Sequence, residues 1–206
     1  MVATVLVYEA TGGTPGSPGA KNRVDGQATN DGTDVRFCTA DAFNDVAAHP
    51  CIIPTLGAGD NYSYWKHLYL NMSGTYTTLN NIRFYTDGTI GWTCGTGGGL
   101  FVGKRAAGDN GCPMDASYDP AEGTAGTTGD WMDDGTDGHT YYKDEAVVPV
   151  DASTYTSVSP LTVDSADYGP DATDDSDAVV LQVVLADDAT QGTQTDETLT
   201  FVYDEI

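Results

Sequence analysis

The stretch NYSYWKHLYLN, residues 61–71, concentrates aromatic and leucine side chains in a chain otherwise rich in Gly, Thr, Ala and Asp. Successive side chains of an extended strand point to opposite faces. One face of this stretch would carry Trp65, His67 and Tyr69, and the other Tyr64, Lys66, Leu68 and Leu70. Both faces are bulky, which predicts a central strand of a sandwich or a strand covered on its outer side. Lys66 is expected to pack its stem on aromatic rings and to place its ammonium group in water.

Alternation of apolar and polar residues predicts further strands along the chain. Their ranges are 2–8, 34–39, 51–55, 81–88, 100–104, 177–187 and 197–206. The segment 12–19 (GGTPGSPG) is expected to be a loop. The strand at 81–88 is expected to pair with the aromatic strand, and the polar link between the last two strands is expected to be a hairpin loop. In residues 177–187, Val179, Leu181, Val183 and Leu185 share one face of the strand, and Val180, Gln182 and Val184 share the other. In residues 197–206, Leu199, Phe201 and Tyr203 are expected to face inward.

No helical pattern exceeds two turns, so the sequence predicts an all-β fold. The spacing of strands and turns favours an antiparallel immunoglobulin-like or jelly-roll-type β-sandwich with long loop insertions, formed as a single domain over residues 1–206. Regular patterning disappears at about 106–140, where turn-forming residues dominate. So long a loop in a compact domain usually has a use. Trp131 and Met132 in this insertion are candidate interaction residues; the alternative is that Trp131 folds back as a lid on the sandwich.

The charge balance excludes several kinds of partner. The 31 acidic residues face 8 basic ones, giving a net charge of −23. Phosphates would be repelled, which argues against nucleic acid and anionic membranes. Such a surface is typical of proteins that work in high salt. No apolar run of 18 residues is present, so no membrane insertion is expected. The first residues lack the basic and long apolar segments of a signal peptide.

Clustered aspartates offer a second explanation of the acidity, because Ca²⁺ prefers oxygen ligands. The candidate runs are 30–34, 130–138 and 171–177, with Asp130, Asp133, Asp134, Asp137, Asp171, Asp174, Asp175 and Asp177 as candidate metal ligands. None matches the register of an EF-hand loop. Asp-Gly pairs also form turns, and this simpler interpretation is favoured. No other cofactor is expected.

Four cysteines form an even set with intervals of 13 and 18 residues. Disulfides Cys38–Cys51 and Cys94–Cys112 are the preferred pairing among three, and free buried thiols are the alternative. The spacing is not that of a zinc ribbon. A metal site formed by Cys38, His49 and Cys51 is a weaker hypothesis.

A search for catalytic signatures finds none. The Gly-rich segment 95–99 lacks the Lys-Ser/Thr of a phosphate loop, and neither G-x-S-x-G nor H-E-x-x-H occurs. His49, His67 and His139 lie far apart in the sequence, and only His49 is close to a cysteine. The sequence therefore predicts a protein without catalytic residues and not an enzyme.

The segments YSYWKHLYLN, NIRFYTDG, GTGGGLFVG and TLTFVYDEI together resemble the strand layout of Ig-like virion structural proteins of tailed bacterial and archaeal viruses. The resemblance covers roughly 61–104 and 177–206. It implies a capsid decoration, tail or fibre subunit that assembles with itself and with other virion proteins, through loops and strand edges, in the virion. Two alternatives stay open. One is an extracellular or cell-surface filament subunit, and the other is a carbohydrate-binding module that uses Trp92, Trp131, Tyr141 and Tyr142.

Overall fold

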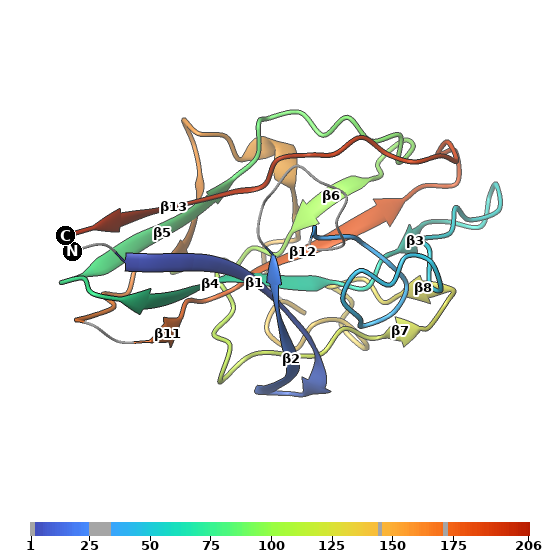
Figure 1. Cartoon of the computed structure of the whole chain (residues 1–206). Coiled ribbons are helices and arrows are strands. Elements are labelled where there is room, and N and C mark those ends of the chain that lie inside the picture. The colour runs from blue at the N-terminus through green and yellow to red at the C-terminus, as the bar shows by residue number, and fades with distance from the viewer. Residues whose placement is uncertain (1–2, 25–33, 144–145, 171–172) are drawn as a thin grey trace.

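The computed structural model of the chain describes residues 3–24, 34–143, 146–170 and 173–206. The fold is all-β, with two antiparallel sheets packed face to face in a sandwich-like arrangement (Figure 1). The described part holds a single helical element, the 3₁₀ turn Ala152–Thr154, and no helix long and apolar enough to cross a bilayer. The predicted fold class is confirmed.

The larger sheet follows the order β2-β1-β4-β12-β3-β8-β7. These strands are β2 (Ser17–Val24), β1 (Ala3–Thr14), β4 (Lys66–Gly74), β12 (Val179–Leu185), β3 (Asn61–Tyr62), β8 (Thr128–Gly129) and β7 (Gly123–Thr124). Three more join it off this path: β11 (Asp174–Asp175) on β4, β6 (Gly99–Val102) on β12, and β9 (Val150–Asp151) on β6. The smaller sheet has the order β10 (Leu161–Asp164), β5 (Leu79–Tyr85) and β13 (Thr200–Glu205).

The main core lies between the two sheets and follows from strand alternation. On β12, Val179, Leu181 and Val183 point inward and meet Leu68 and Leu70 of β4. From the smaller sheet come Leu79, Ile82, Phe84, Leu161 and Val163, all buried. Each buried side chain of this size contributes about 1.5–3 kcal/mol relative to exposure. The inward face expected for Leu199, Phe201 and Tyr203 is confirmed, although these three side chains are only half-buried.

The outer face of the larger sheet is also covered, by the insertion that follows β6. Two further clusters form there, one around Trp65 of β4 and Val180 of β12, the other around Tyr69 of β4 and Ala10 of β1. The insertion contributes Cys112, Met114, Tyr118, Ala121, Met132 and Tyr142 to these clusters. Between 106 and 140 the only strands are the two-residue β7 and β8, so the expected irregular insertion is confirmed. It forms a third layer on the sandwich.

The aromatic strand is central, as expected, because β4 lies between β1 and β12. The expectation that Lys66 reaches water is wrong. Its side chain is only 3% exposed, and its ammonium group donates to the carboxylate of Glu9, which is 0% exposed. An ionic group so deep in a protein needs a partner of opposite charge, and Glu9 of β1 supplies it.

Several expected local features are wrong in detail. Residues 34–39 and 51–55 are not strands, and prolines at 50 and 54 limit the backbone donors of that region. The strand at 81–88 does not pair with β4, because β5 lies in the other sheet between β10 and β13. The link between β12 and β13 passes from one sheet to the other and is not a hairpin.

The segment 12–19 is a tight hairpin and not an open loop. Thr14 of β1 pairs with Ser17 of β2, so only Pro15 and Gly16 lie in the turn. Gly16 has φ +73°, and Pro followed by a positive-φ Gly is the signature of a type II turn. This hairpin extends the edge of the larger sheet.

Candidate functional site

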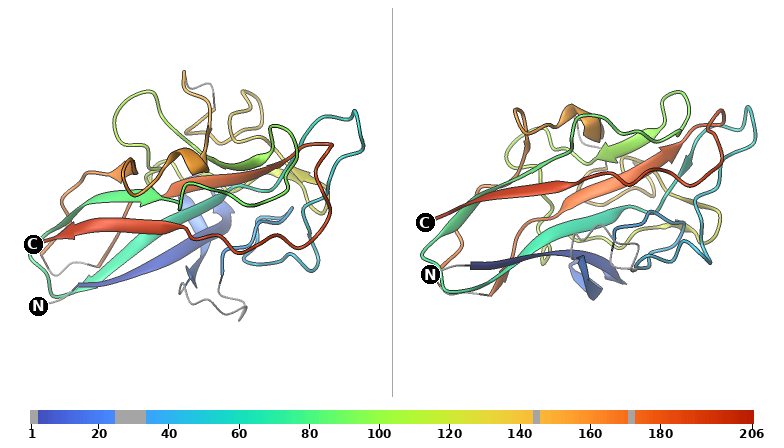
Figure 2. Two further views of the ribbon diagram at one scale, coloured as in Figure 1. Left: turned by 90° about the horizontal axis from the view of Figure 1, so that it is seen from above. Right: turned by 45° about the horizontal axis from the view of Figure 1, so that its top comes forward.

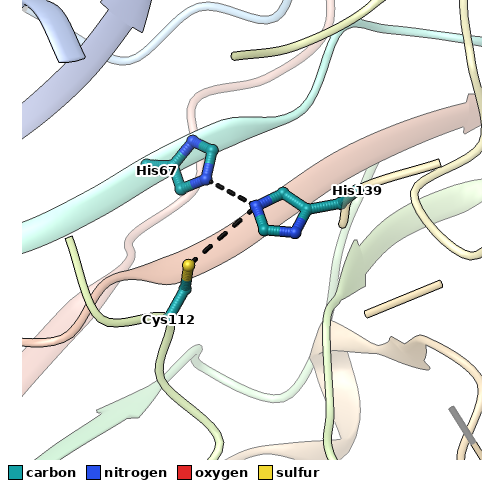
Figure 3. Close-up of side chains that lie close together, drawn as sticks. All are labelled: His67, Cys112 and His139. Carbon is teal, nitrogen blue, oxygen red and sulfur yellow. Dashed lines mark hydrogen bonds between the residues drawn. The ribbon is translucent and has the colours of Figure 1, made fainter. Parts of the chain in front are cut away.

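A buried cluster of His67, Cys112 and His139 lies between the larger sheet and the insertion (Figure 3). His67 projects from the outer face of β4. Cys112 is fixed beside β12, because its backbone exchanges two hydrogen bonds with Ala178. His139 comes from the end of the insertion. Three segments far apart in the sequence thus each contribute one side chain.

The three side chains are close enough to contact a common atom. The Nε2 atoms of His67 and His139 are 2.9 Å apart, and Cys112 Sγ lies 3.9 Å from His139 Nε2. All three ligand atoms lie within 4.8 Å of one another. The exposed fractions of the three residues are 1%, 0% and 0%.

Two glycines next to the cluster residues permit this approach. A Cβ on Gly111 would stand 2.5 Å from the carbonyl oxygen of Val163, and a Cβ on Gly138 would stand 2.4 Å from the carbonyl oxygen of Asp134. Real Cβ atoms do not come so close to backbone, so both positions require glycine. Gly111 brings Cys112 against β12, and Gly138 closes the turn that carries His139.

Aromatic rings enclose the cluster. The ring of Tyr118 lies 4.6 Å from that of His67, and the rings of Tyr142 and Trp65 lie 5.1 and 5.6 Å from that of His139. Their polar atoms are bonded elsewhere: Trp65 to the carbonyl of Asp119, Tyr118 to that of Gly12, and Tyr142 to that of Asn110. The walls of the site are therefore apolar on the side that faces the two imidazoles.

Burial sets the protonation states. Desolvation, followed by the charge of His139, holds the pKa of His67 well below its usual value of 6.5. Desolvation lowers the pKa of His139 to about 4, against an opposing effect of Asp119. Burial, and then Asp177 and Asp119, raise the pKa of the Cys112 thiol. At neutral pH both imidazoles are uncharged and Cys112 is a thiol, a form with little nucleophilic reactivity.

The hydrogen bonds define which nitrogen of His139 carries the proton. Its Nδ1 accepts from the backbone N–H of Tyr141 at 3.1 Å. A neutral imidazole that accepts at Nδ1 is protonated at Nε2, so His139 Nε2–H donates to His67 Nε2. The neighbouring Thr140 donates to the carboxyl group of Asp119 from both its N–H and its hydroxyl. Asp119 thereby anchors the loop that holds His139.

The expected disulfides are absent, because all four cysteines are free. Cys94 and Cys112 pair with Ala186 and Ala178, at opposite ends of β12. Eight residues of strand separate them by about 26 Å, whereas bridged Cα atoms lie within about 7 Å. Cys38 is buried and Cys51 half-buried; burial, and then the neighbouring Cys38, raise the pKa of Cys51 to about 12.

The weaker metal hypothesis for Cys38, His49 and Cys51 is not supported either. His49 Nδ1 lies 2.9 Å from Asp45 Oδ2, so its ring is paired with a carboxylate on the surface. Within the described residues these three side chains do not form a group with metal-ligand spacing.

The aspartate runs do not converge on a cation site. Over the described ranges, no three of their carboxylates come within ligand distance of one another. Asp134 Oδ1 accepts from the N–H groups of Thr136 and Asp137, which is turn chemistry. Asp175 pairs with Lys21 and Asn71.

The other candidate ligands are dispersed as well. Asp174 and Asp175 form β11 on β4, and Asp177 donates its backbone N–H to Asp164. Asp130 packs beside Gln182, which donates to its carbonyl. Burial raises the pKa of Asp177 to about 7. Asp133 makes contacts of its own, and Asp171 and residues 30–33 lie outside the described ranges.

The two candidate interaction residues cover the sheet. Met132 is 0% exposed, so its expected role as an exposed contact is wrong. Trp131 is half-buried and packs edge-on against Phe101, with its ring 5.2 Å from Tyr62. The packing of Trp131 on Phe101 and Tyr62 agrees with the alternative that this residue folds back as a lid.

The aromatic residues suggested for sugar stacking do not share one platform. Trp92 packs on Phe37 beside the main core, while Trp131 and Tyr141 pack on the insertion cluster. Tyr142 is buried. Their dispersal weakens the carbohydrate-binding alternative.

A second candidate site lies on the flank of the sandwich where β1 and β13 run (Figure 2). A groove of about 200 Å³ separates the two strands there. Its lining is mostly apolar and half-buried: Val5, Leu6, Val7, Val24, Val35, Leu199 and Phe201, with Leu68 at the base and Arg23 at the rim. At one end Ala3 N–H donates to Glu205 Oε1 and ties the two strands together.

Sequence reasoning overlooked the histidine–cysteine cluster because it judged the histidines by their separation in the sequence. His67 and His139 are 72 residues apart and hydrogen-bonded. One signal was available: His67 stands between Trp65 and Tyr69 on one face of a strand predicted to be covered on both sides. A histidine on a covered face needs a polar partner from the covering segment.

Comparison with known proteins identifies no relative. No family model, no curated protein and no solved structure matches the chain significantly. The resemblance to Ig-like virion proteins therefore rests on the strand pattern alone, and the function must be argued from the structure.

Proposed function

We propose that the chain is a non-enzymatic structural subunit that associates with copies of itself along the β1/β13 flank. The setting that the strand pattern favours is a virion, as a capsid decoration, tail or fibre component, and a microbial surface filament is the alternative. The immunoglobulin-like type of the sandwich belongs to the same proposal.

The observation that carries the proposal is an apolar groove between β1 and β13, each of which has, over the described residues, a stretch of edge that no other strand pairs with. Among the described strands, β2 pairs with β1 only from Val7 onward, which leaves the edge of Ala3–Leu6 open. β13 pairs with β5 alone. Unpaired strand edges are templates for another strand, and an apolar groove beside such an edge suits an extended segment.

Charge favours a second copy of the chain as the occupant of this flank. A net charge of −23 makes most of the surface self-repulsive. Residues 3–8 carry no charge, and the one charged residue in the lining of the groove is the basic Arg23. Two copies repel each other least where this flank faces itself.

A two-fold arrangement gives the β1 edge of each copy a partner strand at the same time. In such an interface the same patch faces itself, so the β1 edges of two copies can pair antiparallel while their grooves close over each other. Paired edges gain backbone hydrogen bonds, and the half-buried valines and leucines lose contact with water.

Sedimentation equilibrium in low and high salt tests the proposal. Wild-type protein should associate, and more strongly in 1 M NaCl than in 0.1 M, because the screening length falls from about 10 to about 3 Å. Leu6→Asp and Leu6→Lys should both dissociate it, since each places a charge in the groove. Val158→Asp is the matched control, because Val158 is 91% exposed and lies outside the groove.

A wild-type chain that stays monomeric in 1 M NaCl at high concentration contradicts the proposal. So does a Leu6→Asp variant that folds and associates like the wild type. Electron microscopy of the native source then tests the setting, where many symmetric copies of the chain are expected.

A further inference from the structure

We propose that His67, Cys112 and His139 form a binding site for a thiolate-preferring late transition-metal ion, Zn²⁺ or copper, held between the larger sheet and the insertion. This inference is independent of the assembly proposed above, because the cluster and the groove share no residue.

The donor set selects the class of ion. Two imidazole nitrogens and one cysteine sulfur are ligands that suit Zn²⁺ and copper, whereas Ca²⁺ and Mg²⁺ prefer oxygen. Zn²⁺ with three protein ligands takes a water molecule at its fourth position. Copper is also found in trigonal His₂Cys geometry. Within the described residues no fourth His, Cys, Asp or Glu joins the group, and both ions fit a three-ligand site.

The spacing agrees with coordination by a single ion. Metal–ligand bonds of about 2.0–2.3 Å at tetrahedral angles place the ligand atoms roughly 3.3–3.6 Å from one another. The nitrogen–nitrogen distance of 2.9 Å and the sulfur–nitrogen distance of 3.9 Å lie on either side of this range. The third pair, Cys112 Sγ and His67 Nε2, lies within 4.8 Å, so these two side chains must approach each other by up to about 1.2 Å to centre an ion among the three atoms.

His139 has a backbone partner for either tautomer. The form protonated at Nε2 has its Nδ1 bonded by the N–H of Tyr141. Coordination through Nε2 moves the proton to Nδ1, and the carbonyl of His139 itself lies where it stabilises a protonated ring. A metal-ligating histidine typically donates its other N–H in this way. Binding thus replaces the Nε2–H···Nε2 hydrogen bond between the two histidines by two bonds to the metal.

The local charge also accommodates a bound ion. A divalent ion with one thiolate and two neutral imidazoles leaves a net charge of +1 in a buried place. Asp177 and then Asp119 are the acidic groups whose charge acts on Cys112, and they outweigh the opposing charge of Arg105 in their effect on its pKa. Asp119 is itself 5% exposed and held by Thr140. Two acidic side chains beside the site offset the charge that the ion would bring.

Metal content after refolding tests the site. The buried cluster is loaded best while the chain folds, so reduced full-length protein is refolded with Zn²⁺ in one arm and with copper in the other, and then dialysed against a weak chelator. We expect about one ion per chain in at least one arm. Cys112→Ser and His139→Gln should weaken binding of that ion by at least about 100-fold, since even changes behind the ligands cost 10–100-fold.

Cys94→Ser is the matched control, because Cys94 is likewise buried but lies at the other end of β12. It should retain the ion. Circular dichroism verifies the folding of each variant. If the ligand variants do not fold, Co²⁺-loaded wild-type protein gives the answer, since a thiolate ligand produces an intense charge-transfer absorption. Wild-type protein that binds no ion in either arm overturns the inference, as does equal binding by Cys112→Ser and Cys94→Ser, or Co²⁺ binding without that absorption.

Discussion

Lys66 and His67 are adjacent residues of β4, and their side chains point to opposite faces of the larger sheet. Lys66 points to the sandwich interior and pairs with Glu9, which is 57 residues away in the sequence. His67 points to the insertion and bonds to His139. Both side chains are buried, one in an ion pair and the other in a cluster of neutral groups. The alternation of a single strand thus separates two kinds of buried polar chemistry.

The Lys66–Glu9 pair and the histidine–cysteine cluster differ in their capacity to bind a further ion. The Lys66–Glu9 pair has balanced its charge internally, and removal of one partner would leave the other charge stranded. The histidine–cysteine cluster is uncharged, and its three ligand atoms lie within 4.8 Å of one another. The two charges of the first arrangement already offset each other, while the second has the capacity to accept a cation.

Loss of Lys66 is expected to produce the largest effect. Lys66→Met should lower the free energy of unfolding by about 3–5 kcal/mol, because Glu9 would be left buried without its counter-charge. The double variant Lys66→Met/Glu9→Leu should recover most of this loss, since an apolar pair can replace a buried ion pair. Urea denaturation monitored by tryptophan fluorescence measures both.

One outcome would contradict this prediction. If Lys66→Met alone is as stable as the double variant, the pair is not buried as described. The slope of free energy against urea concentration serves as a check that both variants unfold from the same compact state.

Acid should lower the free energy of unfolding of the metal-free protein, because it acts on His139 of the histidine–cysteine cluster. Folding lowers the pKa of His139 from 6.5 to about 4, so the folded state favours the neutral ring. That contribution is fully present above pH 6.5 and is lost as the pH falls toward 4. It amounts to about 3 kcal/mol at most. Asp177, whose pKa rises to about 7, acts in the opposite direction over the same range.

The difference between wild type and His139→Gln isolates the histidine effect. With a chelator present, the gap in stability between the two should narrow from pH 7 to pH 4.5. The imidazole resonances of His139 should not titrate between pH 8 and pH 6. Ordinary titration near pH 6.5 would show that the ring is accessible to water and would contradict the burial.

Loss of the surface pair of His49 and Asp45 is expected to have the smallest effect on stability, in contrast to changes in the two buried clusters. The two side chains are 32% and 39% exposed. Exposed ion pairs contribute about 0–1 kcal/mol, so His49→Gln should change the stability by no more than about 0.5 kcal/mol. A loss of about 2 kcal/mol or more in the free energy of unfolding would show that burial does not explain why the surface pair and the buried clusters differ in their effect on stability.

The sequence alone predicted those features that depend on the alternation of side chains along a strand. The all-β class, the central position of residues 64–70 and the inward face of residues 199–203 all follow from a period of two. The pairing of strands did not follow, because β5 and β13 join the smaller sheet through contacts distant in the sequence. Neither partner of the two buried clusters was predicted, since Glu9 and His139 come from distant segments. Among the candidate ligands chosen by local density, the aspartates that the structure describes lie in turns, in short strands or in the irregular segments beside them.

X-ray absorption spectroscopy of the metal-loaded protein tests the central claim most directly. The account predicts a first shell of one sulfur at about 2.3 Å and two imidazole nitrogens at about 2.0–2.1 Å around Zn²⁺. A shell composed only of oxygen would place the ion among the surface carboxylates and would contradict a site formed by His67, Cys112 and His139.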